Sequence, residues 1–179
     1  MKMVALLRGI NVGGNRKVPM PKLIALIENS GFTAVKSYIN SGNIVFEAST
    51  LSPEQAGAKL ERAIAKEFGF PVDVIVRTAA KWKKYASGSP FPSAASIRPK
   101  MLHIGLAKDP IKGDITDGLM EKALHGEKIA IVDGAIWVDF AKSVGKSKLT
   151  PAVLDKAAGS TVTLRNWNTV VKINEMLNE

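Results

Sequence analysis

A glycine-rich stretch near the start of the chain holds most of the residues that could bind a ligand. Residues 6–20 read LLRGINVGGNRKVPM, in which three glycines follow an apolar run. Backbone N–H groups at the start of a helix favour an anion, because the helix dipole places partial positive charge there. Arg8, Arg16 and Lys17 add full positive charges to the same stretch. The candidate ligand-binding residues are Arg8, Gly9, Asn11, Gly13, Gly14, Asn15 and Lys17.

A structural interpretation of these glycines stays open beside the functional one. Glycine adopts positive φ without steric cost, and tight connections between a strand and a helix often need it. The two asparagines and three cations packed around the glycines favour a ligand, since a turn alone does not require them.

The elements that would position this stretch follow a regular order in the first half of the chain. Met3 to Arg8 is rich in strand formers, and apolar residues of 20–30 recur at helical spacing. Asn40-Ser41-Gly42-Asn43 separates two β-prone runs, which is typical of a hairpin turn. Ser52-Pro53-Glu54-Gln55 has the form of a capping box, and a fourth strand is expected at Val72 to Arg77. The first half is therefore predicted to be βαββαβ.

The second half is predicted to repeat this order. Its expected strands and helices are 101–106, 116–124, 128–132, 136–140, a helix from Pro151, 161–165 and 167–177. We therefore expect an α+β protein with two tandem ferredoxin-like βαββαβ units, each an antiparallel sheet with helices on one face. The predicted domains are residues 1–86, which end in a basic helical turn, a Pro- and Ser-rich linker at 87–99, and residues 100–179 with a C-terminal helix.

This topology brings polar residues from distant segments together. The first and second strands of a βαββαβ unit run in the same direction, so the loop after the first lies beside the turn after the second. Three further candidates for the same site are Ser41, Gly42 and Asn43.

A second polar cluster is expected at the opposite end of the second sheet. It comprises Lys146, Ser147, Lys148, Arg165, Asn166, Trp167 and Asn168. Asn166 also stands where a helix N-cap belongs, and Trp167 also suits a hydrophobic core, so both residues have a structural alternative.

Composition excludes several classes of chemistry. The 179 residues include no Cys, which rules out disulfides, thiol nucleophiles and Cys-ligated zinc or iron–sulfur sites. His103 and His125 are far apart in the sequence, so no metal site and no cofactor are expected. No long apolar run or signal segment stands out, so we expect a cytoplasmic protein without a membrane partner.

The chain is basic, with a formal net charge of +9. Residues 1–94 hold 13 Lys and Arg against 6 Asp and Glu, whereas residues 95–179 hold 12 against 10. The positive excess therefore lies in the first half. Such a field favours nucleic acid or phosphorylated small molecules as partners.

Four segments resemble a known family. LLRGINVGGNRKVPM, YINSGNIVF, SKLTPAVLDKAAG and TLRNWNTVVKINEML are similar to the signature segments of an uncharacterised bacterial family catalogued as domain of unknown function 1697. The similarity extends from Met3 to Leu177. It implies duplicated ferredoxin-like units and no established activity.

Three functions remain open. The first is an anion-binding protein, in which the basic first half binds phosphate groups of nucleic acid; Phe46 is its one candidate for stacking on a base. The second is an enzyme or sensor for a small phosphorylated or carboxylated metabolite, although no catalytic constellation is recognisable. The third is a structural or interaction protein without a ligand. The sequence predicts no oligomeric state.

Overall fold

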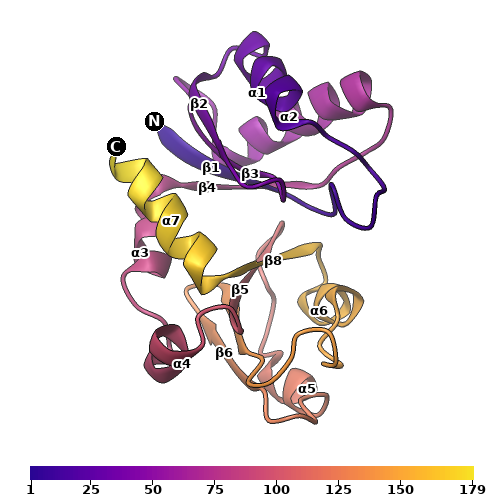
Figure 1. Cartoon of the computed structure of the whole chain (residues 1–179), viewed down its shortest axis with the longest axis vertical. Helices are drawn as coiled ribbons and strands as arrows, with labels where there is room; N and C mark the ends of the chain where they lie inside the picture. Colours follow the sequence, from indigo (N-terminus) through magenta and orange to yellow (C-terminus); the bar gives the residue numbers. More distant parts are fainter. The chain divides into compact units, whose positions relative to one another are not determined.

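The computed structural model describes residues 1–179, and the chain divides into two compact units (Figure 1). Unit 1 comprises Met1–Lys83 and Ile173–Glu179, and unit 2 comprises Lys84–Lys172. None of the seven helices offers the length and apolar character that crossing a bilayer requires.

Unit 1 has the predicted βαββαβ order. Its elements are β1 (Lys2–Leu7), α1 (Met20–Asn29), β2 (Thr33–Tyr38), β3 (Asn43–Glu47), α2 (Pro53–Phe68) and β4 (Val74–Thr78). The strands are ordered β2-β3-β1-β4, and each neighbouring pair is antiparallel. Helices α1 and α2 cover one face of this sheet (Figure 1).

Hydrophobic burial explains that arrangement. Leu23 and Ile27 on α1 and Leu60 and Ile64 on α2 are fully buried against the sheet, and Phe46 of β3 lies in the same core. The spacing of four residues within each helix places these side chains on a single face. Transfer of this apolar surface out of water is the main favourable term that holds the layers together.

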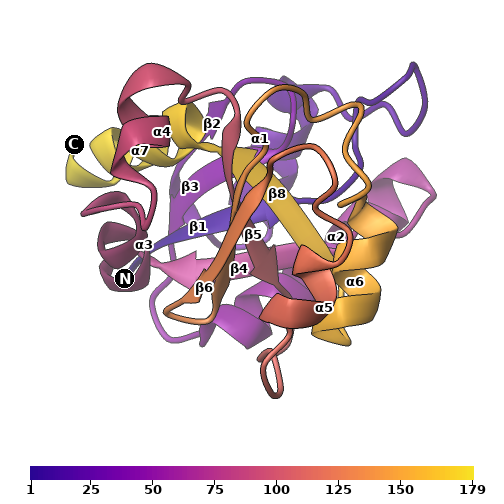
Figure 2. The same cartoon turned by 90° about the horizontal axis from the view of Figure 1, so that it is seen from below.

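Unit 2 repeats the topology. It contains β5 (Leu102–Ala107), α5 (Thr116–Met120), β6 (Lys128–Val132), β7 (Ala135–Asp139), α6 (Pro151–Ala158) and β8 (Val162–Asn166). Its strands are ordered β6-β7-β5-β8, again antiparallel, and its core lies between the sheet and α5 and α6 (Figure 2). The predicted fold class, two tandem ferredoxin-like units, is therefore confirmed.

Several local predictions are also confirmed. Ser52 Oγ accepts the N–H of Gln55 at 3.2 Å, and Gln55 Oε1 accepts the N–H of Ser52 at 2.9 Å, which completes the capping box of α2. The strands expected at 128–132 and 136–140 pair as a hairpin, which turns at Asp133 and Gly134, both with positive φ. Helix α5 ends at Met120 instead of Leu124, since Gly118 weakens the helix and Ile115 provides no side-chain cap.

Three helices lie outside the two repeats. They are α3 (Ala79–Ala86), α4 (Pro92–Ile97) and α7 (Trp167–Asn178). Helix α4 lies inside the stretch expected to be a linker, and Arg98 at its C-terminal end forms a two-pronged ion pair with the buried Asp139 of β7, at 3.0 and 2.5 Å. The domain boundaries after residues 86 and 99, as limits of independent folding, stay a prediction.

The last turns of α7 belong to unit 1 and lie on the sheet face away from α1 and α2. Lys2 of β1 donates from Nζ to the carbonyl oxygen of Leu177 at 3.1 Å, and Lys36 of β2 forms an ion pair with Glu179 at 2.7 Å. Strand register places Lys2 and Lys36 on the same face as Val45. A third helix therefore occupies part of a face that two-layer units of this kind can leave open.

Candidate functional site

The glycine-rich stretch forms a small hairpin between β1 and α1, which projects from unit 1 (Figure 2). Val12 and Asn15 form a β-bridge, in which the N–H of Asn15 donates to the carbonyl oxygen of Val12 at 3.1 Å. Gly13 and Gly14 lie at the tip with φ of 59° and 78°. Positive φ at both central residues matches the right-handed twist of a hairpin, and glycine adopts it without strain. Both residues are exposed, and open space surrounds them.

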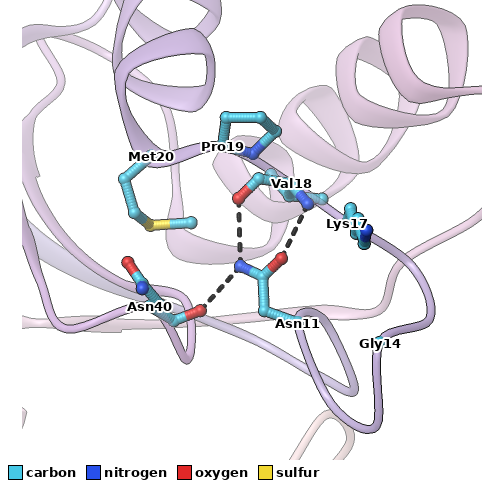
Figure 3. A pocket seen from close by; sticks show the side chains of 7 residues that line it. All are labelled: Asn11, Gly14, Lys17, Val18, Pro19, Met20 and Asn40. Atoms are coloured by element: carbon cyan, nitrogen blue, oxygen red, sulfur yellow. Dashed lines mark hydrogen bonds between the residues drawn. The ribbon is translucent and has the colours of Figure 1, made fainter.

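Asn11 fastens the base of this hairpin to its surroundings (Figure 3). Its Nδ2 donates to the carbonyl oxygens of Val18 at 3.0 Å and Asn40 at 2.8 Å, and its Oδ1 accepts the N–H of Val18 at 2.8 Å. The loop after β1 and the turn after β2 therefore meet, as the topology predicts. The carboxamide of Asn11 is used for this purpose, so Asn11 shapes the site from within the protein.

The three hydrogen bonds of the Asn11 carboxamide form a clamp between the hairpin and the turn after β2. An open hollow of about 380 Å³ lies beside this clamp. Its lining residues are Asn11, Gly14, Lys17, Val18, Pro19, Met20 and Asn40 (Figure 3). The lining contains no carboxylate, and the ammonium group of Lys17 forms no ion pair or hydrogen bond within the chain. One cation and a largely apolar wall therefore define the chemistry of this hollow.

The predicted residues Ser41, Gly42 and Asn43 build the neighbouring turn and do not line the hollow. Asn43 is buried, and its Nδ2 donates to Tyr38 O and Ser41 Oγ, both at 3.0 Å. A Cβ added to Gly42 would lie 2.6 Å from Leu7 Cβ, which is too close for any side chain. These residues therefore set the distance between the turn and β1.

Arg8, Gly9, Asn15 and Arg16 also lie outside the hollow. Arg8 is half-buried and donates its backbone N–H to the carbonyl oxygen of Asp73 at 3.0 Å. The guanidinium group of Arg16 donates to the carbonyl oxygen of Pro71 and lies 5.4 Å from the centroid of the Phe70 ring. Arg16 therefore anchors the hairpin to the segment before β4, and Lys17 is the cation left at the hollow.

Ser147, in the second predicted cluster, is engaged inside unit 2. Its Oγ donates to Glu127 Oε1 at 2.5 Å and accepts the N–H of Leu149 at 3.2 Å. Burial acts to raise the pKa of Glu127, but hydrogen bonds from Ser147 and the His125 N–H hold that pKa below its usual value. Lys146 and Lys148, on either side of Ser147, are exposed.

The other members of this cluster support α7 and β8. Asn166 Oδ1 accepts the N–H of Thr169 at 3.0 Å, so Asn166 is the helix N-cap, as its structural alternative predicted. The Trp167 ring packs against Trp137 with centroids 5.8 Å apart, and Asn168 is exposed. Arg165 is buried, which lowers its pKa to about 10, and its Nη1 donates to Thr163 Oγ1 at 2.8 Å.

Phe46 cannot stack on a base. The side chain is fully buried under the helices and contacts Phe32 edge-to-face, with ring centroids 4.9 Å apart. Register alternation places Phe46 on the covered face of the sheet, so this part of the nucleic-acid hypothesis is wrong.

Sequence reasoning did not select Val18, Pro19 and Met20 as site residues, although they form the apolar wall of the hollow. Their place directly after the cationic stretch and at the start of α1 was the available signal. Apolar side chains at a helix start normally indicate core packing, which is why they did not stand out.

The fold and this hollow define an α+β protein of two ferredoxin-like units with a small, carboxylate-free hollow at one end of the first. The chain belongs to the family described as "Protein of unknown function (DUF1697)", whose model matches residues 1–137. The matched range includes the hairpin and the turn, whereas the RNWNT segment lies beyond it.

A solved structure shares this architecture over nearly the whole chain. The conserved bacterial protein SP0830 from Streptococcus pneumoniae is 28% identical, with a TM-score of 0.72, and the match covers 98% of each chain. No match was found among the curated proteins.

Proposed function

We propose that this protein binds a phosphate-bearing ligand in the hollow between the hairpin and the turn after β2. The observation that carries the proposal is Lys17, an ammonium group without a partner beside a hollow that contains no carboxylate. A cation that is not neutralised within the protein is available to an anion from solution. Gly14, which is exposed, also lines the hollow.

The charge of the chain supports the same ligand class. Thirteen of the 25 Lys and Arg residues but only six of the 16 Asp and Glu residues lie within residues 1–94. A positive field of this kind raises the local concentration of anions and speeds their association. Phosphate groups of a nucleotide or of a nucleic acid both match that field.

The chemistry of the lining favours binding over catalysis. General acid–base catalysis needs a group that exchanges a proton near neutral pH, and the lining contains neither a histidine nor a carboxylate. A volume of about 380 Å³ falls within the range of small-molecule sites. A small phosphorylated ligand is therefore the form of the proposal that this geometry supports best.

Calorimetric titration with inorganic phosphate and pyrophosphate at low salt tests the proposal. We expect Lys17→Ala to abolish or strongly weaken binding, and Lys22→Ala, which removes the same charge from exposed surface of α1, to retain it. Equal affinity in both variants, or no binding by the wild-type protein, would contradict a site at this hollow.

A further inference from the structure

The side chain of Asn40 offers a second, chemically different contact at the same hollow. The backbone carbonyl of Asn40 accepts the hydrogen bond from Asn11 Nδ2 at 2.8 Å, which fixes the residue in place. Its side-chain carboxamide is exposed and has no partner within the chain. The unused carboxamide therefore offers N–H donors and a carbonyl acceptor from a backbone that is held in place.

Met20 completes that side of the hollow. Figure 3 shows the Asn40 carboxamide next to the Met20 side chain, with Gly14 and Lys17 on the other side of Asn11. The Met20 thioether is apolar and polarisable, and such groups pack well against the faces and edges of aromatic rings. The hollow therefore has a polar edge and an apolar surface on one side and a cation on the other.

Resting on the proposed function, we infer that the ligand is a nucleotide, with its base at Asn40 and Met20 and its phosphate at Lys17. An Asn carboxamide pairs with the adjacent acceptor and donor of a base edge, most familiarly adenine N7 and N6. Inorganic phosphate alone would leave the Asn40 and Met20 side of the hollow empty. A volume of about 380 Å³ accommodates a mononucleotide.

Two sources carry this chemistry, a free mononucleotide and the phosphorylated 5′ end of a nucleic-acid strand. The hollow is open to solvent, and its lining residues are shared by both sources. Comparison of adenosine 5′-monophosphate with short single strands, with and without a 5′-phosphate, separates the two. In either case the phosphate and the adjoining base form the recognised unit.

The test measures the affinity of the full chain for adenosine 5′-monophosphate, ribose 5-phosphate and adenosine by calorimetry. We expect the nucleotide to bind at least about tenfold more tightly than ribose 5-phosphate, because only the nucleotide reaches both sides of the hollow. Asn40→Ala is expected to weaken nucleotide binding about three- to tenfold and to leave ribose 5-phosphate binding unchanged. Asn29→Ala, an exposed asparagine at the end of α1, is the matched control and should bind as the wild type does.

The outcomes separate this inference from the proposed function. Equal affinity for the nucleotide and ribose 5-phosphate, with both lost in Lys17→Ala, would overturn the nucleotide assignment and leave the anion site intact. Loss of both ligands in Asn40→Ala at an unchanged melting temperature would also overturn the assignment, since Asn40 would then act on the phosphate. Binding of neither ligand by the wild type would overturn both.

Discussion

At the scale of single residues, the hydrogen-bond partners of a polar side chain decide whether it is available to a ligand. Asn11 has a φ of 55°, a left-handed conformation that asparagine adopts more readily than most residues. Its carboxamide makes three hydrogen bonds to main-chain atoms. Asn11 therefore belongs to the framework of the hollow, whereas Lys17 and Asn40 present unused polar groups to it.

Replacement of Asn11 by alanine should destabilise unit 1 and loosen the hairpin. The change removes three hydrogen bonds and leaves the carbonyls of Val18 and Asn40 without their donor, for a cost of about 1–2 kcal/mol. Denaturant unfolding measures the loss, and Asn29→Ala, with its exposed side chain, should change stability by less than about 0.5 kcal/mol. Similar stability in the two variants would show that the clamp is not formed in solution.

His103 should make the stability of the protein depend on pH. Burial lowers the pKa of His103 below its usual value. The His103 ring packs edge-on against the Phe140 ring, with ring centroids 5.1 Å apart. Below about pH 6.5 His103 takes up a proton in the unfolded chain, whereas in the folded protein it stays neutral down to its lower pKa. The free energy of unfolding therefore falls as the pH falls from about 6.5 toward the pKa of the folded state. Each pKa unit of that lowering corresponds to about 1.4 kcal/mol in the free energy of unfolding.

Unfolding measured from pH 7.5 to pH 5 checks this expectation. The free energy of unfolding of His103→Gln should change less with pH than that of the wild type, whatever the absolute stability of the variant. His125→Gln, which removes an exposed histidine, is the comparison variant. Equal slopes in all three proteins would refute the assignment to His103.

At the scale of elements, short sequence signals set where helices and hairpins begin and end. The capping box at Ser52 and Gln55 begins α2 as the sequence indicated, and the left-handed Gly69 ends it. Helix α4 has no side-chain cap, and the three prolines in residues 87–99 suggested a linker. The ion pair between Arg98 and Asp139 spans 41 residues of sequence, so local patterns could not reveal it.

Gly42→Ala should be among the most destabilising single-methyl changes in unit 1. The new Cβ would lie 2.6 Å from Leu7 Cβ, and the residue would keep a φ of 78°. Strain and overpacking together should cost more than about 2 kcal/mol. Gly134→Ala has nearly the same φ, 74°, but open space around it, and should cost only about 1 kcal/mol. Comparable losses in a denaturant titration would refute the close contact.

At the scale of the whole molecule, one topology occurs twice with different surface charge. Both sheets have the same strand order, yet the positive excess lies in the first 94 residues. Duplication of a fold therefore does not duplicate a site, because surface side chains vary without disturbing the core. The hollow with its free cation lies in unit 1 at the loop after β1, whereas Ser147 lies in the loop between β7 and α6 of unit 2 and is engaged with Glu127.

This asymmetry predicts which lysines matter for polyanions. In titrations of a labelled single-stranded oligonucleotide, Lys17→Ala/Lys22→Ala should weaken binding more than Lys146→Ala/Lys148→Ala, although each pair removes two exposed charges. Affinity should fall steeply with salt, since each neutralised phosphate contributes about 0.7 to the logarithmic slope. Equal losses of affinity in the two double variants would indicate nonspecific electrostatic attraction. No binding by the wild type at low salt would refute the nucleic-acid form of the proposal.

The sequence by itself determined the order of the strands and helices within the two βαββαβ units, the duplication, and most turns and caps. These follow from backbone preferences and hydrophobic periodicity, which act over a few residues. Only the tertiary structure decided which polar residues remain available. Asn11 meets Asn40 across 29 residues, and Ser147 meets Glu127 across 20. Tertiary packing determines these partners, because polar groups that become buried form hydrogen bonds with whatever groups the fold brings near them. A ligand site can therefore be recognised only after those hydrogen bonds have been assigned.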